Sequence, residues 1–171
     1  MSRSMMRPVC SRMSLHIARR RAGTRASHLP AGPRDLGVVG EGAHVERDGR
    51  TSAISVSSTA QSPLRVVGSR SHAGDSLKQF LAEIGDHELL SMGSSLKLCL
   101  VAEGKADIYP RIGPTSEWDT AAAQAVVEAA GGKVTETSGK PLMYNRKESL
   151  LNPYFLVFGD SSREWHNYFS D

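Results

Sequence analysis

The chain has 171 residues, of which 39% are hydrophobic and 23% charged, and its formal net charge is +3. No apolar run approaches the roughly 20 residues that a membrane-spanning helix needs. The two cysteines, Cys10 and Cys99, are too few for the disulfide framework of a small secreted protein and fit a reducing cytoplasm. In an apolar run, Cys99 is expected to be a small buried side chain.

Residues 1–36 differ in composition from the rest of the chain. They hold eight arginines, no lysine and one acid, a formal charge of +7, which leaves −4 for residues 37–171. Such a segment is typical of a transit peptide, of a nucleic-acid-binding arm, or of a disordered tail translated from upstream DNA in the wrong frame. Nothing after it resembles a cleavage site or a nucleic-acid module, so we favour the disordered tail and expect no nucleic-acid partner.

The remainder, large enough for one hydrophobic core, predicts alternating strands and helices. Residues 51–57 alternate apolar and polar side chains, which indicates a strand, and residues 58–63 are a polar linker. Apolar spacing in residues 75–84 predicts an amphipathic helix that ends at Gly85. Further strands are predicted at residues 64–68, 88–92, 106–110, 133–136, 142–144 and 155–158, and a terminal helix at residues 162–169. This alternation is typical of an α/β or mixed layer fold.

Asp119 begins the strongest helical pattern. The alanine-rich run to Ala130 has high helix propensity, Asp is a favoured N-cap, and Gly131 and Gly132 suit the turn that closes a helix. A helix N-terminus attracts phosphate, and a carboxylate there can also hold a hard cation such as Mg²⁺. Spacing alone favours a simple cap.

Residues 66–157 resemble the inositol-monophosphatase-like phosphatase superfamily, and within it the 3′(2′),5′-bisphosphate nucleotidase branch of the CysQ type. Trp118-Asp119-Thr120-Ala121-Ala122, followed by Glu128-Ala129-Ala130-Gly131-Gly132, matches the superfamily pattern W-D-x-A-A…E-A-G-G. Several segments match the nucleotidase branch in the expected order, among them Ser69-Arg70-Ser71-His72, Gly93-Ser94-Ser95-Leu96-Lys97 and Gly113-Pro114-Thr115-Ser116-Glu117. A looser resemblance begins near Gly40.

The resemblance implies the C-terminal α/β domain of the inositol monophosphatase/fructose-bisphosphatase-like fold, a mixed sheet flanked by helices. Residues 96–103 are then a helix. Residues 37–63 would be a hairpin and linker from the other half of the fold, and residues 64–171 the C-terminal domain.

The resemblance also implies a Mg²⁺-dependent phosphatase of sulfate assimilation. Its substrates would be adenosine 3′,5′-bisphosphate (PAP), which yields AMP, and the related 5′-phosphosulfate (PAPS). Asp119 would be a Mg²⁺ ligand, while Trp118 is expected to be a core anchor rather than a platform for the base. The residues expected to bind substrate are Ser71, His72, Gly93, Ser94, Ser95, Lys97, Arg111, Glu117 and Asp119.

The family's other metal ligands, a glutamate pair and a D-P-x-D-G-T motif, have no match in this sequence. We therefore expect a C-terminal half that supplies no catalytic residue of its own and has little or no hydrolase activity alone. One alternative is a non-catalytic nucleotide-binding or dimerising fragment. Another is an inositol phosphatase, against which Ser71-His72 and Ser94-Ser95-Leu96-Lys97 argue. We expect a cytoplasmic protein, with homodimerisation and peripheral association with the inner membrane left open.

Overall fold

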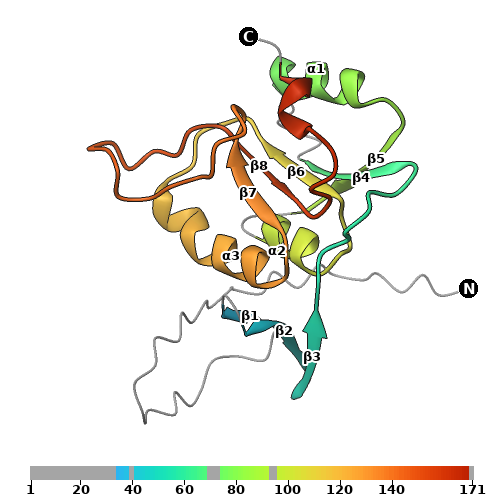
Figure 1. The fold of residues 1–171 in the computed structure, drawn as a ribbon, viewed down its shortest axis with the longest axis vertical. Helices are drawn as coiled ribbons and strands as arrows, with labels where there is room; N and C mark the ends of the chain where they lie inside the picture. Colours follow the sequence, from blue (N-terminus) through green and yellow to red (C-terminus); the bar gives the residue numbers. More distant parts are fainter. Residues whose placement is uncertain (1–33, 39–40, 69–73, 93–95, 170–171) are drawn as a thin grey trace, which may run out of the picture.

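The computed structural model describes residues 34–38, 41–68, 74–92 and 96–169 (Figure 1). They form a three-stranded antiparallel sheet and a five-stranded mixed sheet, with helices on both faces of the larger sheet. The expected α/β fold with a mixed sheet flanked by helices is therefore confirmed. No helix in these ranges is long and apolar enough to cross a membrane.

The smaller sheet consists of β1 (Arg34–Val38), β2 (Gly42–Arg47) and β3 (Arg50–Ile54), in that order. The β2–β3 turn has positive φ at Asp48 and Gly49, as a tight Asp-Gly hairpin requires. The first three residues of β1 belong to the segment that composition had grouped with the arginine-rich leader.

The larger sheet has the strand order β5-β4-β6-β8-β7. Strand β4 runs parallel to β5 and to β6, whereas β8 is antiparallel to both β6 and β7. The parallel strands therefore end at the same sheet edge. The bounds are β4 (Leu64–Gly68), β5 (His87–Ser91), β6 (Ile108–Arg111), β7 (Lys133–Glu136) and β8 (Phe155–Phe158).

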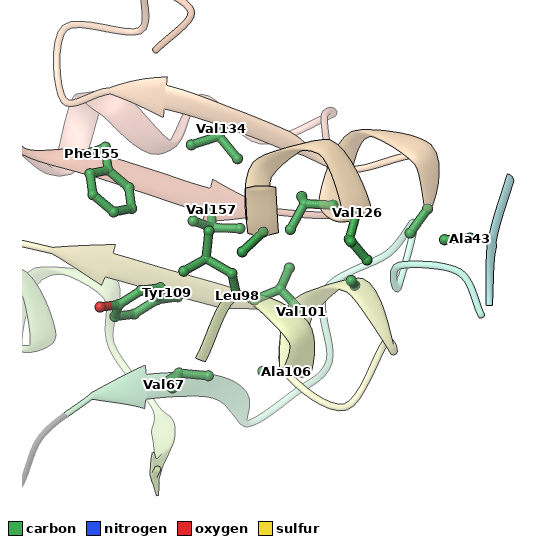
Figure 2. Packing of buried hydrophobic residues seen from close by; sticks show 14 of the residues in the cluster. Ala43, Val67, Leu98, Val101, Ala106, Tyr109, Val126, Val134, Phe155 and Val157 are labelled. Carbon is green, nitrogen blue, oxygen red and sulfur yellow. The ribbon is translucent and has the colours of Figure 1, made fainter. Parts of the chain in front are cut away.

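The two faces of this sheet carry separate hydrophobic clusters. Helices α2 (Leu96–Ala102) and α3 (Glu117–Ala129) cover one face, and their side chains pack on Phe155 and Val157 of β8 (Figure 2). Helix α1 (Asp75–Ile84) and the short 3₁₀-helix η1 (Trp165–Tyr168) pack on the opposite face. Burial on both faces explains why β8 is a continuous apolar run rather than an alternating one.

Three local expectations were wrong. Ser116, not Asp119, is the N-cap of α3, and Asp119 lies at the third helical position. Residues 142–144 form no strand, because the chain there makes only a single bridge between Pro141 and Thr135. The terminal helix is reduced to η1, which packs through Trp165 against Phe158.

Candidate functional site

A pocket of about 400 Å³ lies where β6 ends and where α2 and α3 begin. Strands β4 and β5 run parallel and end at the same sheet edge as β6, where ligands commonly bind in open α/β folds. Ser71, His72, Gly93, Ser94 and Ser95, which were expected to bind substrate, lie outside the described residues. The pocket is lined by Lys97, Leu98, Tyr109, Arg111, Pro114, Thr115, Trp118, Asp119, Thr120 and Phe155.

Lys97 lines this pocket from α2 and is only 8% exposed. Its ammonium nitrogen lies 5.6 Å from the centre of the Tyr109 ring, and it makes no ion pair with any described residue. Burial lowers the pKa of Lys97, and the nearby positive charge of Arg111 lowers it further. A buried, unpaired ammonium is unfavourable, and a bound anion would relieve the cost.

Arg111 ends β6 and is the second cation of the pocket. Its Nη2 donates to the carbonyl of Pro114 at 2.9 Å, which ties the guanidinium to the loop before α3. Its Nε is buried and has no hydrogen-bond partner among the described residues. Two cations with unused donors make this pocket suited to a phosphate.

Asp119 lines the same pocket from the first turn of α3. Its Oδ2 accepts the backbone N–H of Ser116 at 2.9 Å, the contact made by an acidic residue in a capping box. The pattern Ser116-x-x-Asp119 was the sequence signal for this arrangement. No cluster of three or more His, Cys, Asp or Glu residues able to hold a metal occurs in the described ranges.

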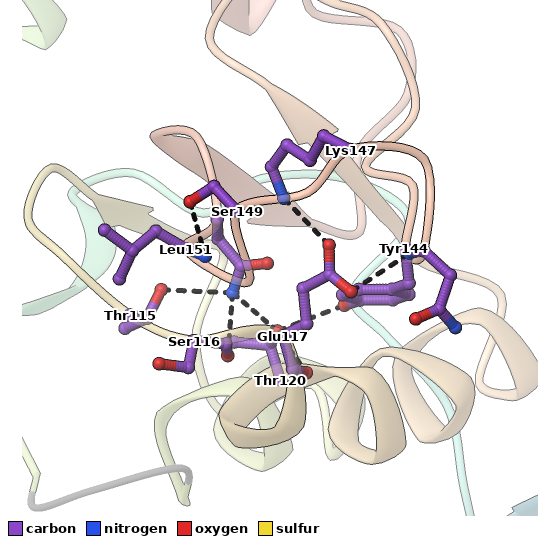
Figure 3. A network of polar contacts seen from close by, with 10 residues as sticks. Thr115, Ser116, Glu117, Thr120, Tyr144, Lys147, Ser149 and Leu151 are labelled. Carbon is purple, nitrogen blue, oxygen red and sulfur yellow. Dashed lines mark hydrogen bonds and ion pairs between the residues drawn. The ribbon is translucent and has the colours of Figure 1, made fainter.

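Glu117 is not among the residues that line the pocket. Its carboxylate accepts Lys147 Nζ at 2.8 Å and the backbone N–H of Asn145 at 3.0 Å, so it fastens the loop after β7 to the start of α3 (Figure 3). These two bonds, led by that of Lys147, lower the pKa of Glu117. Lys147 lies 30 residues from Glu117 in sequence, and no local sequence pattern indicates this ion pair.

Trp118 contradicts its expected role as a core anchor. The side chain is 68% exposed and lines the pocket beside Asp119. Tyr109, Thr115 and Phe155 also line it, although the sequence did not single them out. Thr115 belongs to one of the motif segments, and Tyr109 and Phe155 belong to predicted strands, but none of these patterns marked them as binding residues.

Comparison with known proteins identifies the family. The model of the inositol monophosphatase family matches residues 30–166. The chain belongs to the inositol monophosphatase family. It is 57% identical over 98 residues to the 3′(2′),5′-bisphosphate nucleotidase CysQ of Escherichia coli (strain K12), an alignment that covers 57% of this chain and 39% of that protein. The corresponding Buchnera aphidicola protein is 50% identical over 114 residues, or 66% of this chain and 42% of the relative.

Solved structures of the inositol monophosphatase family show the same fold. The crystal structure of CysQ from Bacteroides thetaiotaomicron matches with a TM-score of 0.62 at 40% identity, covering 73% of this chain and 52% of that one. The chain thus spans about two fifths of the length of these curated relatives and about half of this structural relative.

Proposed function

We propose that this chain is the substrate-phosphate-binding part of a 3′(2′),5′-bisphosphate nucleotidase, which removes the 3′-phosphate of PAP to give AMP and also acts on PAPS. The name of the E. coli relative supports this substrate class. The proposed setting is sulfur metabolism in the cytoplasm.

One observation carries the proposal, namely the pair of unsatisfied cations in the pocket. Lys97 is buried without an ion-pair partner in the described residues, and Arg111 Nε is buried without an acceptor there. Charged donors left without partners are costly in a folded protein. A phosphate oxygen is the acceptor that satisfies both groups, so these residues hold the anion while Asp119 stands beside it.

The proposed cofactor is Mg²⁺, for which the described residues supply one candidate ligand. Asp119 Oδ2 accepts the N–H of Ser116, which leaves Oδ1 for a cation. Mg²⁺ takes several oxygen ligands, so these residues alone do not make a magnesium site, and the other carboxylates belong to the family's D-P-x-D-G-T half. When bound, the metal would neutralise the phosphate and lower the pKa of the attacking water.

The test uses calorimetry and phosphate release with this 171-residue chain. We expect AMP and PAP to bind without Mg²⁺, and little phosphate to be released with or without it. Joining a D-P-x-D-G-T half from a family member ahead of residue 30, where the family match begins, should give Mg²⁺-dependent hydrolysis of PAP. Robust hydrolysis by the 171 residues alone would contradict the assignment of the remaining ligands to that half.

A second candidate is a non-catalytic nucleotide-binding module. The observation in its favour is that Asp119 belongs to no cluster of three or more His, Cys, Asp or Glu residues in the described part of the chain. The two candidates predict different activities for the chain joined to the D-P-x-D-G-T half. That chain hydrolyses PAP if the pocket is part of an active site, and it does not if the pocket only binds nucleotides. Competition between AMP and inositol monophosphate distinguishes both from an inositol phosphatase.

A further inference from the structure

Trp118 presents a large aromatic surface to solvent at the edge of the pocket. Among the exposed large hydrophobic side chains of the described residues it has the highest exposed fraction, 68%. The other tryptophan, Trp165, is 1% exposed and lies in the core. An aromatic ring left in water beside a binding pocket is available for a ligand.

The backbone that carries this indole is fixed on both sides. Glu117 is held by Lys147 and by the N–H of Asn145 (Figure 3). Asp119 is held by the N–H of Ser116. The first turn of α3 therefore cannot swing away without breaking these contacts. A ring attached to a fixed backbone loses little conformational entropy when a ligand packs on it, which favours binding.

The pocket thus combines two different chemistries. Lys97 and Arg111 supply positive charge, and Trp118 supplies a flat apolar face. A polyol phosphate would use the cations alone, whereas a nucleotide offers a phosphate to the cations and a planar base to the indole. We propose that the Trp118 ring stacks on the base of the bound nucleotide. This inference rests on the proposed function of the same pocket.

Stacking a base on an aromatic side chain contributes enough for a clear measurement. The contribution of about 1–3 kcal/mol per base corresponds to a change in affinity of about 5- to 150-fold. The discriminating quantity is the affinity for AMP divided by that for ribose 5-phosphate, which has the phosphate and sugar but no base. Replacing the ring should reduce this ratio, whereas a role in folding would change both affinities together.

The experiment measures both ligands by calorimetry with the full 171-residue chain, its Trp118→Ala and Trp118→Phe variants, and a Leu151→Ala control. Leu151 is also an exposed apolar side chain and pairs with Ser116 through a β-bridge, yet it does not line the pocket. We expect W118A to weaken AMP binding about tenfold while ribose 5-phosphate binding is unchanged. W118F should keep most of the affinity, and L151A should match the unaltered chain.

Tryptophan fluorescence supplies a second readout. AMP should quench the exposed indole and ribose 5-phosphate should not, and W118F should remove the AMP-dependent change. An unchanged affinity ratio in W118A overturns the inference, and so does an effect of W118A on self-association with the ratio intact. If neither ligand binds the unaltered chain, the phosphate pocket itself is wrong and the inference fails with it.

Discussion

At the scale of single residues, Lys97 shows how binding and stability oppose each other. The side chain is 8% exposed, and the charge that acts on it has the same sign, that of Arg111. Burial of an unpaired ammonium costs free energy in the empty protein. The same feature suits an anion site, because a bound phosphate would replace the water that solvates the ammonium in the unfolded chain.

The lowered pKa of Lys97 predicts how anion affinity depends on pH. Because burial lowers the pKa below its ordinary 10.5, the ammonium loses its proton at a lower pH in the empty pocket than in water. AMP affinity should therefore fall as the pH rises through the folded-state pKa of Lys97. Burial raises the pKa of Tyr109, so its hydroxyl stays neutral in this range. Calorimetry between about pH 7 and pH 10 measures the effect.

The variant Lys97→Met removes the charge and keeps a similar volume. It should weaken AMP binding at neutral pH about tenfold or more, since charge-assisted bonds contribute about 1.5–3 kcal/mol, and it should abolish the decline with pH. It should also raise the free energy of unfolding. The matched control is Lys78→Met on α1, where Lys78 is exposed and pairs with Asp75. A K97M protein that binds AMP normally would contradict the anion site.

At the scale of elements, the start of α3 is held in place by the loop after β7. Asn152 is 7% exposed, and its Nδ2 donates to Thr115 Oγ1, the Ser116 carbonyl and Thr120 Oγ1. Its backbone N–H also donates to the Thr115 carbonyl at 2.8 Å. These bonds fix the turn from which Trp118 and Asp119 enter the pocket.

We expect Asn152→Ala to lower the free energy of unfolding by about 1–3 kcal/mol, because it removes the hydrogen bonds that the Asn152 side chain makes to Ser116 and Thr120 at the start of α3. Urea denaturation measures the loss. The control is Ser149→Ala in the same loop, whose hydroxyl accepts only an exposed bond from the Leu151 N–H at 3.3 Å and should change stability by less than about 0.5 kcal/mol. Equal effects of the two variants would show that Asn152 does not anchor α3.

The amino-acid sequence predicted the bounds of those helices and strands whose apolar periodicity and turn residues lie within the segment itself. The bounds of α1, β7 and β8 agree with the structure, because apolar periodicity and nearby turn residues are contained within each segment. Lys97, Arg111 and Asp119 were singled out and do line one pocket. The differences depend on distant partners: β1 forms by pairing with β2, Glu117 meets Lys147, and the exposure of Trp118 depends on which elements cover it.

At the scale of the whole molecule, the small sheet is joined to the large domain by close backbone packing. The connecting segment bonds to the end of α3 through Val56 N–H and the Ala130 carbonyl, at 3.1 Å. Strand β1 lies against α3 at Gly37, where an added Cβ atom would stand 2.8 Å from Val126 Cα. A side chain at Gly37 would therefore push the small sheet away from the helix that carries Asp119.

Gly37→Ala should consequently lower the free energy of unfolding by about 1–3 kcal/mol through overpacking. The added methyl would stand 3.0 Å from Ala129 Cβ as well as close to the Val126 backbone, and neither group is the free end of a flexible side chain. Gly113→Ala is the matched control, since the nearest atom to its added Cβ is Arg111 Cζ at 4.0 Å, and it should be neutral or stabilise by up to about 1 kcal/mol. Denaturant unfolding measures both variants, and hydrogen exchange of the β2 amides reports whether the small sheet detaches first. If G37A were as stable as G113A with β2 fully protected, the small sheet would not depend on its contact with α3.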